Sequence, residues 1–356
     1  MAGKLLTPAV TGALLFALTS SPDRFREPLL AQLKQYLSVE NIGRLITGLK
    51  WLVALGVISD ANKWLSELAQ NNFRLRSEKH RYHWPQEVAV ITGATGGFGS
   101  LMSKDFASRG VNVMALDIRD ELPADMKNNP KIHYFKCDVT DRQQVADVAK
   151  QIREQHGDPS ILINNAGISS EGPILEQSEK DLRRVFDINI ISHYYTAQEF
   201  LPAMAKNKKG HVVTIASMAA FATTPGLVPY SNTKVAAWGF HEGLQSETRV
   251  FLNAPEVKFS VVHPSFANTP MVAPFKLELE SSGARVITAE SVSDAVVKQV
   301  ISGRGKQIIL PGNLGAAVWF RTVPYWLSLG LLSLGDKNAR KSYEKLLPKI
   351  STRKGQ

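Results

Sequence analysis

Cysteine is nearly absent from this chain: Cys137 is the only one among its 356 residues. A single cysteine excludes an intramolecular disulfide framework and a zinc site made of four cysteines. The eight histidines include no pair with H-x-x-x-H or H-E-x-x-H spacing, so we expect no metal site. No N-x-S/T sequon occurs either, and together these absences favour a fold that faces the cytosol.

Long uninterrupted hydrophobic runs are also missing. Residues 5–19 are uncharged and apolar, but the run is shorter than the roughly 20 residues that a spanning helix needs. Hydrophobic residues make up 44% of the chain and charged residues 21%, which is ordinary for a globular protein. This composition excludes a disordered chain, a collagen-like repeat and a polytopic membrane protein.

Acidic residues are outnumbered by basic ones, 32 against 42, which gives a net charge of +10. The excess is concentrated in two places. Residues 336–356 carry seven basic and two acidic residues, a net +5, and residues 70–86 carry four and one, a net +3. Both clusters follow apolar stretches, so we expect an anionic membrane surface as the partner and no nucleic acid.

The N-terminal residues 1–86 differ from the rest of the chain in their hydrophobic pattern. A second apolar run, 42–59, holds Arg44 and Lys50, and this pattern favours a helix lying in a membrane interface. Two alternatives stay open: a pair of ordinary helices packed on the domain, or a cleaved signal peptide at the first run.

Short apolar runs alternate with amphipathic segments over residues 87–312. This order predicts an α/β domain with a doubly wound, seven-stranded parallel sheet, the Rossmann arrangement. We expect strands at 88–91, 111–116, 132–135, 161–163, 212–215, 259–262 and 307–310, and helices near 98–109, 141–156, 176–206, 229–252 and 290–302.

Residues 313–356 form an apolar and then basic C-terminal extension. Arg321 and Pro324 interrupt its apolar part, 314–334, which argues against a simple spanning helix. An interfacial membrane element and a cap over the substrate pocket are both open, and one segment can do both.

A glycine-rich turn follows the first predicted strand and opens a helix: Thr92-Gly93-Ala94-Thr95-Gly96-Gly97-Phe98-Gly99. Glycines allow a tight turn and let the backbone approach a pyrophosphate at the helix N-terminus, where free N–H groups favour anions. The strand–turn–helix context therefore predicts a dinucleotide site.

Asp117 ends the second predicted strand. A carboxylate there accepts hydrogen bonds from a ribose 2′-hydroxyl and repels a 2′-phosphate, which favours NAD(H) over NADP(H). Arg109 and Arg119 lie nearby in the sequence and could weaken this preference. We also assign Asp138 and Val139, after the third strand, to the cofactor site; the alternative for Asp138 is a solvated turn residue or a cap for the helix that starts near Asp141.

Tyr230 and Lys234 lie four residues apart and therefore share one helix face. Tyrosine, with a pKa of about 10, is a poor base at neutral pH, and a neighbouring ammonium favours its phenolate. Such a pair suits general acid–base chemistry. Ser217 ends the fifth predicted strand, 13 residues upstream of Tyr230, and a turn of sequence Asn164-Asn165-Ala166-Gly167 follows the fourth.

These motifs, in this order and spacing, resemble the short-chain dehydrogenase/reductase family over residues 87–312. The resemblance implies a catalytic tetrad of Asn189, Ser217, Tyr230 and Lys234. It also implies an NAD(P) site that includes Asn165, Tyr230, Lys234 and Thr269, hydride transfer to and from an alcohol carbon, and homodimers or homotetramers. Pro264-Ser265 replaces the family's proline–glycine turn, and Phe98 stands where isoleucine is usual; both put loop geometry in doubt.

The outer segments resemble, more loosely, those of membrane-associated hydroxysteroid and retinol dehydrogenases, on the residues Trp64-Leu65-Ser66 and Asn71-Asn72-Phe73. This implies a lipophilic alcohol or carbonyl substrate and an enzyme on the endoplasmic reticulum or a lipid droplet, with the catalytic domain in the cytosol. The alternatives are a soluble NADP(H)-dependent carbonyl reductase of a biosynthetic pathway and a lipid-surface scaffold with a vestigial dehydrogenase domain.

Overall fold

The computed structural model describes residues 7–281, 283–334, 340 and 344. The chain forms two compact units, Met1–Ala69 and Gln70–Gln356. Apart from Arg340 and Glu344, the basic stretch 336–356 lies outside the described residues.

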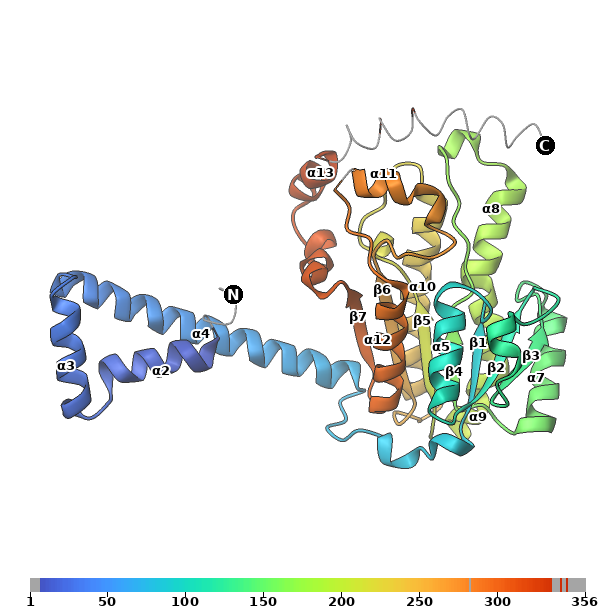
Figure 1. The fold of residues 1–356 in the computed structure, drawn as a ribbon, viewed down its shortest axis with the longest axis horizontal. Helices are drawn as coiled ribbons and strands as arrows, with labels where there is room; N and C mark the ends of the chain where they lie inside the picture. Colours follow the sequence, from blue (N-terminus) through green and yellow to red (C-terminus); the bar gives the residue numbers. More distant parts are fainter. Residues whose placement is uncertain (1–6, 282, 335–339, 341–343, 345–356) are drawn as a thin grey trace. The chain divides into compact units, whose positions relative to one another are not determined.

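The second unit is built on a seven-stranded parallel sheet with strand order β3-β2-β1-β4-β5-β6-β7 (Figure 1). All seven predicted strands are confirmed, at β1 Val88–Thr92, β2 Asn112–Asp117, β3 Ile132–Lys136, β4 Ile161–Asn164, β5 His211–Ile215, β6 Lys258–Pro264 and β7 Lys306–Leu310. The strand order reverses between β1 and β4. In an open parallel sheet, ligands bind beyond the carboxyl ends of the strands at such a switch point.

Helices cover both faces of the sheet, which explains why most strand residues are apolar. Along β1, Ala89 and Ile91 pack into one core and Val88 and Val90 into the other. The first core lies under α5 Gly97–Ser108 and α12 Ala289–Ser302; the second lies under α7 Arg142–His156, α9 Ser192–Lys206 and α10 Val228–Val250 (Figure 1). Two short helices, α6 Ala124–Lys127 and α11 Lys276–Ser281, lie in the connections.

The long helix predicted at 176–206 is interrupted. It consists of α8 Glu179–Phe186, a π-helical turn Asp187–Ile191, and α9. Single π turns inside helices often mark functional sites because they change which side chains face inward. Here the turn carries Asn189, which is fully buried.

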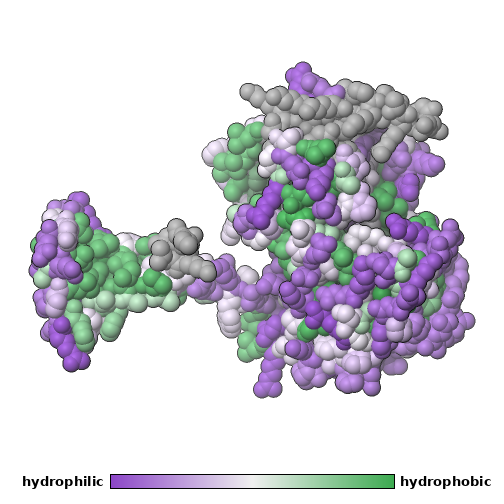
Figure 2. All heavy atoms as spheres, viewed as in Figure 1, coloured by the Kyte–Doolittle hydropathy of each residue, from purple (hydrophilic) through white to green (hydrophobic). Residues whose placement is uncertain are grey.

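From residue 7 onward, the first unit is made of three helices: α2 Pro8–Thr19, α3 Asp23–Lys34 and α4 Val39–Gln70, whose last residue already belongs to the second unit. The predicted run 42–59 lies within α4, whose 32 residues are long and apolar enough to cross a membrane. Pro8 of α2 packs so closely on Gly56 of α4 that a Cβ at Gly56 would lie 2.5 Å from the proline ring. Apolar side chains gather on the surface of this unit (Figure 2), where Trp51 and Ile58 are about two-thirds exposed.

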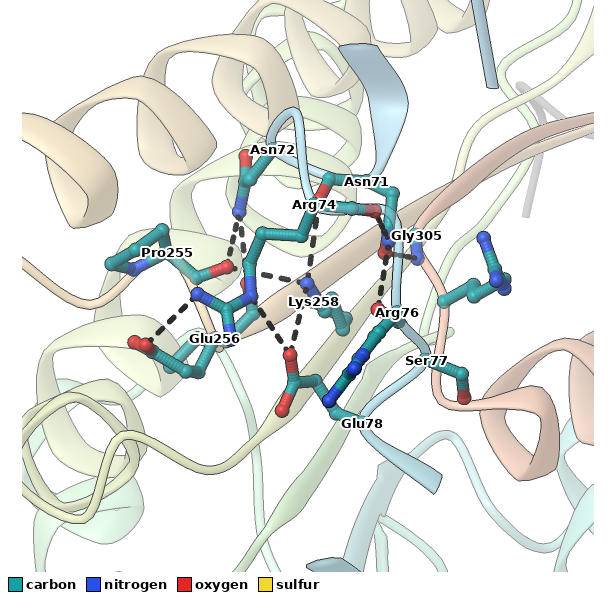
Figure 3. Close-up of polar contacts among 12 residues, drawn as sticks. Asn71, Asn72, Arg74, Arg76, Ser77, Glu78, Pro255, Glu256, Lys258 and Gly305 are labelled. Carbon is teal, nitrogen blue, oxygen red and sulfur yellow. Dashed lines mark hydrogen bonds and ion pairs between the residues drawn. The ribbon is translucent and has the colours of Figure 1, made fainter. Parts of the chain in front are cut away.

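Residues 71–78 contact the rest of the second unit, which carries the predicted catalytic residues and is called the catalytic unit below, through a polar network (Figure 3). At its centre is Lys258, a fully buried residue at the start of β6. Its Nζ lies 3.9 Å from Glu78 and donates to the carbonyls of Asn71 (3.4 Å) and Pro255 (3.3 Å). Arg74 binds the same Glu78 at 2.8 Å. This segment, which we call the linker clamp (residues 70–78), is therefore part of the catalytic unit and no free tether.

The described part of the C-terminal extension forms a 3-10 helix, Gly312–Arg321, and α13 Tyr325–Ser333. Arg321 Nε donates to the carbonyl of Phe221 at 3.2 Å. Because Phe221 follows Ser217 by four residues, the extension contacts the loop that leaves the predicted active site. Trp319 and Trp326 are exposed on the same extension, and the two alternatives for its role stay predictions.

Candidate active site

The glycine-rich turn after β1 has the backbone shape that its sequence predicts. Gly93 and Gly97 adopt positive φ angles of 61° and 50°, a region that favours glycine. A Cβ at Gly99 would lie 2.0 Å from the carbonyl oxygen of Gly93. Helix α5 begins at Gly97, and its N-cap residue, Gly96, has no side chain that could accept a hydrogen bond from the first turn. The first backbone N–H groups of the helix can therefore bind an anion. The turn therefore fits a pyrophosphate.

Thr92 and Asn165 lie beneath this turn and hold it. Thr92 is buried, and its Oγ1 accepts the N–H groups of Asn165 and Ala166, both at 3.0 Å. The Asn165 amide donates to the carbonyls of Thr92 (2.9 Å) and Gly93 (3.1 Å). These two side chains, predicted at the cofactor site, thus act there by positioning the loop.

Asp117 lies at the end of β2 beside the same turn. Its carboxylate accepts the backbone N–H of Thr95 at 3.0 Å and that of Arg119 at 3.3 Å. The Arg119 guanidinium lies over the turn, within 3.6 Å of a Cβ built on Gly96.

Arg109 does not belong to this site, so the expectation that it could weaken the NAD preference is wrong. It follows the last residue of α5 and pairs with Asp105 at 2.9 Å. A helix of 12 residues spans about 18 Å, and this length separates Arg109 from the glycine turn at the other end.

Three further predicted cofactor contacts are Asp138 and Val139, after β3, and Thr269, after β6. Asp138 Oδ1 accepts the N–H and Oγ1–H of Thr140, at 2.9 and 2.7 Å, which is the turn geometry that the sequence left open. Val139 beside it is buried. Thr269, after β6, lies across from the glycine turn, with its Cγ2 3.7 Å from a Cβ built on Gly97.

Asn189 connects the predicted catalytic helix to the Asn-Asn-Ala-Gly turn. Its amide donates to the Ile168 carbonyl (2.9 Å) and to Thr233 Oγ1 (3.0 Å), and its Oδ1 accepts the Ile168 N–H at 2.8 Å. Thr233 donates in turn to the Tyr230 carbonyl at 2.7 Å. A Cβ on Gly167 would lie 3.4 Å from Asn189 Oδ1 and 3.5 Å from Lys234 Nζ, so the turn packs directly against both side chains.

Ser217, Tyr230 and Lys234 come together at the carboxyl ends of β5 and β6. Ser217 follows β5, and its Oγ accepts the Ala219 N–H at 3.1 Å and donates to the Pro264 carbonyl at 3.5 Å. Burial raises the pKa of Tyr230, and a hydrogen bond with Ser217 opposes that shift.

Lys234 lies under the tyrosine ring. Its Nζ is 5.6 Å from the ring centroid of Tyr230 and donates to the Ile215 carbonyl at 2.9 Å. Burial lowers the pKa of Lys234 to about 8. A cation over the ring face is the arrangement that favours the phenolate.

A family model described as "short chain dehydrogenase" matches residues 87–280, more than half of the chain. The chain belongs to the short-chain dehydrogenase family. It is therefore an NAD(P)-dependent oxidoreductase that acts on CH–OH groups, interconverting an alcohol and its carbonyl form.

Named relatives of this dehydrogenase come from fungi and mammals. It is 34% identical to "Dehydrogenase RED2" of Cochliobolus heterostrophus, with 70% of this chain and 92% of that protein covered. It is 35% identical to human "Estradiol 17-beta-dehydrogenase 11", with 66% and 78% covered. A short chain dehydrogenase/reductase of Burkholderia phymatum in complex with NAD has the same fold: TM-score 0.60, 24% identity, 66% and 92% covered.

Sequence reasoning missed one polar residue that this dehydrogenase places at the site. Thr233 joins Asn189 to the Tyr230 carbonyl, and its position three residues after Tyr230 on one helix is a signal that could have identified it. Arg119 was noted, but its guanidinium beside Gly96 follows only from the loop geometry.

Proposed function

We propose that this dehydrogenase interconverts a lipophilic alcohol and its ketone or aldehyde, using Ser217, Tyr230 and Lys234 as the reacting set. The observation that carries the proposal is their arrangement: the Lys234 ammonium lies 5.6 Å from the ring centroid of Tyr230, and Ser217 is close enough to lower the pKa of the phenol by hydrogen bonding.

Each residue has a role that its surroundings support. Tyr230 takes the alcohol proton in oxidation and returns it in reduction. Ser217 donates to the substrate oxygen and stabilises charge that develops there. Lys234, with its pKa lowered by burial to about 8, holds an ammonium near the phenol at neutral pH. The nicotinamide cofactor supplies the hydride chemistry when bound.

Asn189 acts on the geometry of this set. Its amide is satisfied by Ile168 and Thr233, which fixes the π turn against the loop after β4. Through Thr233 it also holds the main chain at Tyr230. We therefore assign Asn189 the role of keeping the tyrosine and lysine in register, with Gly167 packed against both Asn189 and Lys234.

An apolar substrate is supported by the residues around the site's outer loop. Phe266 and Met271 flank Thr269, and both expose 38% of their surface; Leu277 on α11 exposes 81%. Exposed apolar side chains beside a reacting group suit a hydrophobic ligand. The name of the human relative, an estradiol dehydrogenase, is in line with this substrate class.

Membrane association is the second part of the proposal. α4 is long and apolar enough to span a bilayer, and its side chains are mostly exposed. Arg74 and Arg76 follow it directly, and basic residues next to a membrane helix favour the cytosolic side. We place the catalytic unit in the cytosol, at the surface of the endoplasmic reticulum or a lipid droplet.

The substrate class is tested with the full chain in detergent micelles, supplied with NAD⁺ and a series of secondary alcohols. We expect kcat/KM for estradiol and decan-2-ol to exceed that for propan-2-ol by at least about 100-fold. The reason is that each buried CH₂ contributes about 0.8 kcal/mol and 1.4 kcal/mol is tenfold. Equal kcat/KM across the series would contradict an apolar pocket, and no turnover of any alcohol or ketone would contradict the function.

Cofactor preference is the third part, and we propose that NAD(H) binds more tightly than NADP(H) because of Asp117. Separate titrations of NADH and NADPH should give a Kd ratio of about tenfold or more in favour of NADH, since a charge-assisted hydrogen bond contributes about 1.5–3 kcal/mol. Asp117→Ala should reduce this ratio. Arg119→Ala should increase it, because the guanidinium beside the glycine turn attracts a 2′-phosphate.

Arg109→Ala is the matched control for Arg119→Ala, because it removes the same charge at the far end of α5. The Kd ratio should stay unchanged in that variant. Tighter binding of NADPH in the unaltered chain would overturn the assignment of Asp117.

A further inference from the structure

We propose that His263 is a positioning residue for Ser217, and that Gln307 keeps His263 in the one tautomer that does this. The inference rests on the proposed function, in which Ser217 contacts the substrate. It is carried by a series of hydrogen bonds that runs from Gln307 near the start of β7, through His263 of β6, to Ser217, which follows β5.

The first link joins β6 to the residue after β5. His263 Nδ1 lies 3.1 Å from the backbone carbonyl of Ser217. On the other side of the ring, His263 Nε2 lies 3.2 Å from the side-chain nitrogen of Gln307. His263 itself is fully buried.

The tautomer follows from the chemistry of these partners. A backbone carbonyl only accepts hydrogen bonds, so Nδ1 must carry the proton. Nε2 then has a lone pair, and the Gln307 amide group donates to it. Burial lowers the pKa of His263 to about 4, against the effect of the Ser217 carbonyl. The ring is therefore neutral, with the same proton placement, throughout the pH range of an assay.

The ring is also fixed by packing. Phe221 lies against it with ring centroids 4.6 Å apart, and Trp238 of α10 is 5.4 Å away nearly edge-on. Phe221 is itself held by Arg321 at its carbonyl. A side chain confined by these rings and bonded at both nitrogens has one orientation, which it transmits to the Ser217 backbone.

Gln307, at the far end of this series of hydrogen bonds, is held by the linker clamp. The backbone N–H of Gln307 donates to Gln70 Oε1 at 3.0 Å, and the Gln70 carbonyl accepts from Gln245 of α10 at 3.2 Å. Gln70 is the last residue of α4. The residue at which the N-terminal helix meets the catalytic unit thus supports the strand that orients His263.

The position of Ser217 matters because its hydroxyl must meet a substrate oxygen and the Tyr230 phenol together. A misplacement of about 1 Å can cost about 100-fold in rate. Ser217 stands where β5 ends and a 3-10 helix, Met218–Ala220, begins. The Ser217 carbonyl accepts the N–H of Ala220 at 3.0 Å within this turn, and His263 adds a second bond to the same oxygen from the neighbouring strand.

The test compares His263→Leu with His263→Asn in the full chain in detergent, with NADH and a ketone of the class established for the unaltered enzyme. We expect His263→Leu to lower kcat by about 10- to 100-fold while the Kd for NADH changes less than about twofold. Asparagine places an amide nitrogen near the Nδ1 position, so His263→Asn should recover kcat to within about fivefold. His241→Leu is the matched control, because His241 is a buried histidine of α10 packed on Phe259, and its kcat should be unchanged.

A double-mutant cycle separates positioning from general loss of structure. If His263 acts through Ser217, His263→Leu should change kcat by less than about twofold in a Ser217→Ala background. A full additional loss in that background, or no recovery with asparagine, would overturn the proposal. If His263→Leu does not fold, Gln307→Leu replaces it in the cycle, with an expected fall in kcat of about threefold to tenfold that disappears in the Ser217→Ala background.

Failure of the proposed function gives a different result. Full turnover by Ser217→Ala alone would show that the serine is not part of the reacting set. An inactive Ser217→Ala variant together with a fully active His263→Leu variant would remove only the positioning role.

Discussion

Replacing Tyr230 with phenylalanine is expected to lower turnover by about 1,000-fold while NADH still binds. The change removes one hydroxyl and keeps the ring that lies over Lys234. General acid–base catalysis by a positioned side chain contributes about 10²–10⁴-fold, and no other described residue is placed to take that proton. Measured kcat for alcohol oxidation and a fluorescence titration of NADH give the two quantities.

The role of Tyr230 as acid and base also predicts how the rates of oxidation and reduction change with pH. Burial raises the pKa of Tyr230, so the phenol is protonated at neutral pH in the protein without cofactor. Oxidation of an alcohol needs the phenolate, and reduction of a ketone needs the phenol. The rate of oxidation should therefore rise with pH and the rate of reduction should fall, and the Tyr230→Phe substitution should remove both trends.

Tyr194→Phe is the control, because Tyr194 on α9 is 48% exposed and packs against Phe240, away from Ser217 and Lys234. Its kcat should stay within about twofold of the unaltered chain, as for most surface substitutions. Turnover by Tyr230→Phe at the unaltered rate would contradict the assignment of the tyrosine as the acid and base.

The sheet was predictable because its residues leave a strong pattern. Strands buried on both faces are continuous apolar runs, and each run was found within two residues of its observed ends. The glycine turn and the Tyr–Lys pair were equally predictable because both depend on residues close together in the sequence. Glycine is favoured where φ is positive, and residues four apart share one face of a helix.

Other features depend on contacts that sequence distance hides. Arg109 is close to Asp117 in the sequence, but a helix length separates it from the glycine turn. The π turn at Asn189 could not be predicted from hydrophobic periodicity. Asn189 is held there by a hydrogen bond to Ile168, in the loop after β4, and such a contact is visible only in the folded chain. A charged residue such as Lys258 is expected at the surface, and only the folded linker clamp shows that it is buried.

The linker clamp leads to the second large effect, in which Glu78→Ala is expected to destabilise the catalytic unit by about 3–5 kcal/mol. Glu78 is the carboxylate nearest to the buried Lys258, and it is bound by Arg74 at 2.8 Å as well. Removing one partner of a buried ion pair leaves the other charge uncompensated, and losses of about 3–5 kcal/mol are typical. Urea unfolding followed by tryptophan fluorescence measures the change.

A second substitution, at Lys258, tests whether the loss of stability comes from the unpaired lysine. In the Glu78→Ala background, Lys258→Met removes the uncompensated ammonium and fills its space with an apolar chain. Since replacing buried ion pairs by apolar residues is often neutral or stabilising, the double variant should recover most of the lost stability. Glu179→Ala is the control: its exposed pair with Arg183 should contribute about 0.5 kcal/mol or less.

The same network predicts which N-terminal truncations leave the catalytic unit stably folded. A chain starting at Gln70 keeps the linker clamp and lacks α2, α3 and most of α4, so it should fold and leave the membrane fraction. A chain starting at Trp84 lacks Asn71, Arg74 and Glu78 and should unfold at lower urea by more than Glu78→Ala does. Equal stability of the two chains would show that the clamp is dispensable. A stable Gln70 chain that stays in the membrane fraction would assign the anchor to residues 314–334, whose exposed Trp319 and Trp326 suit an interface.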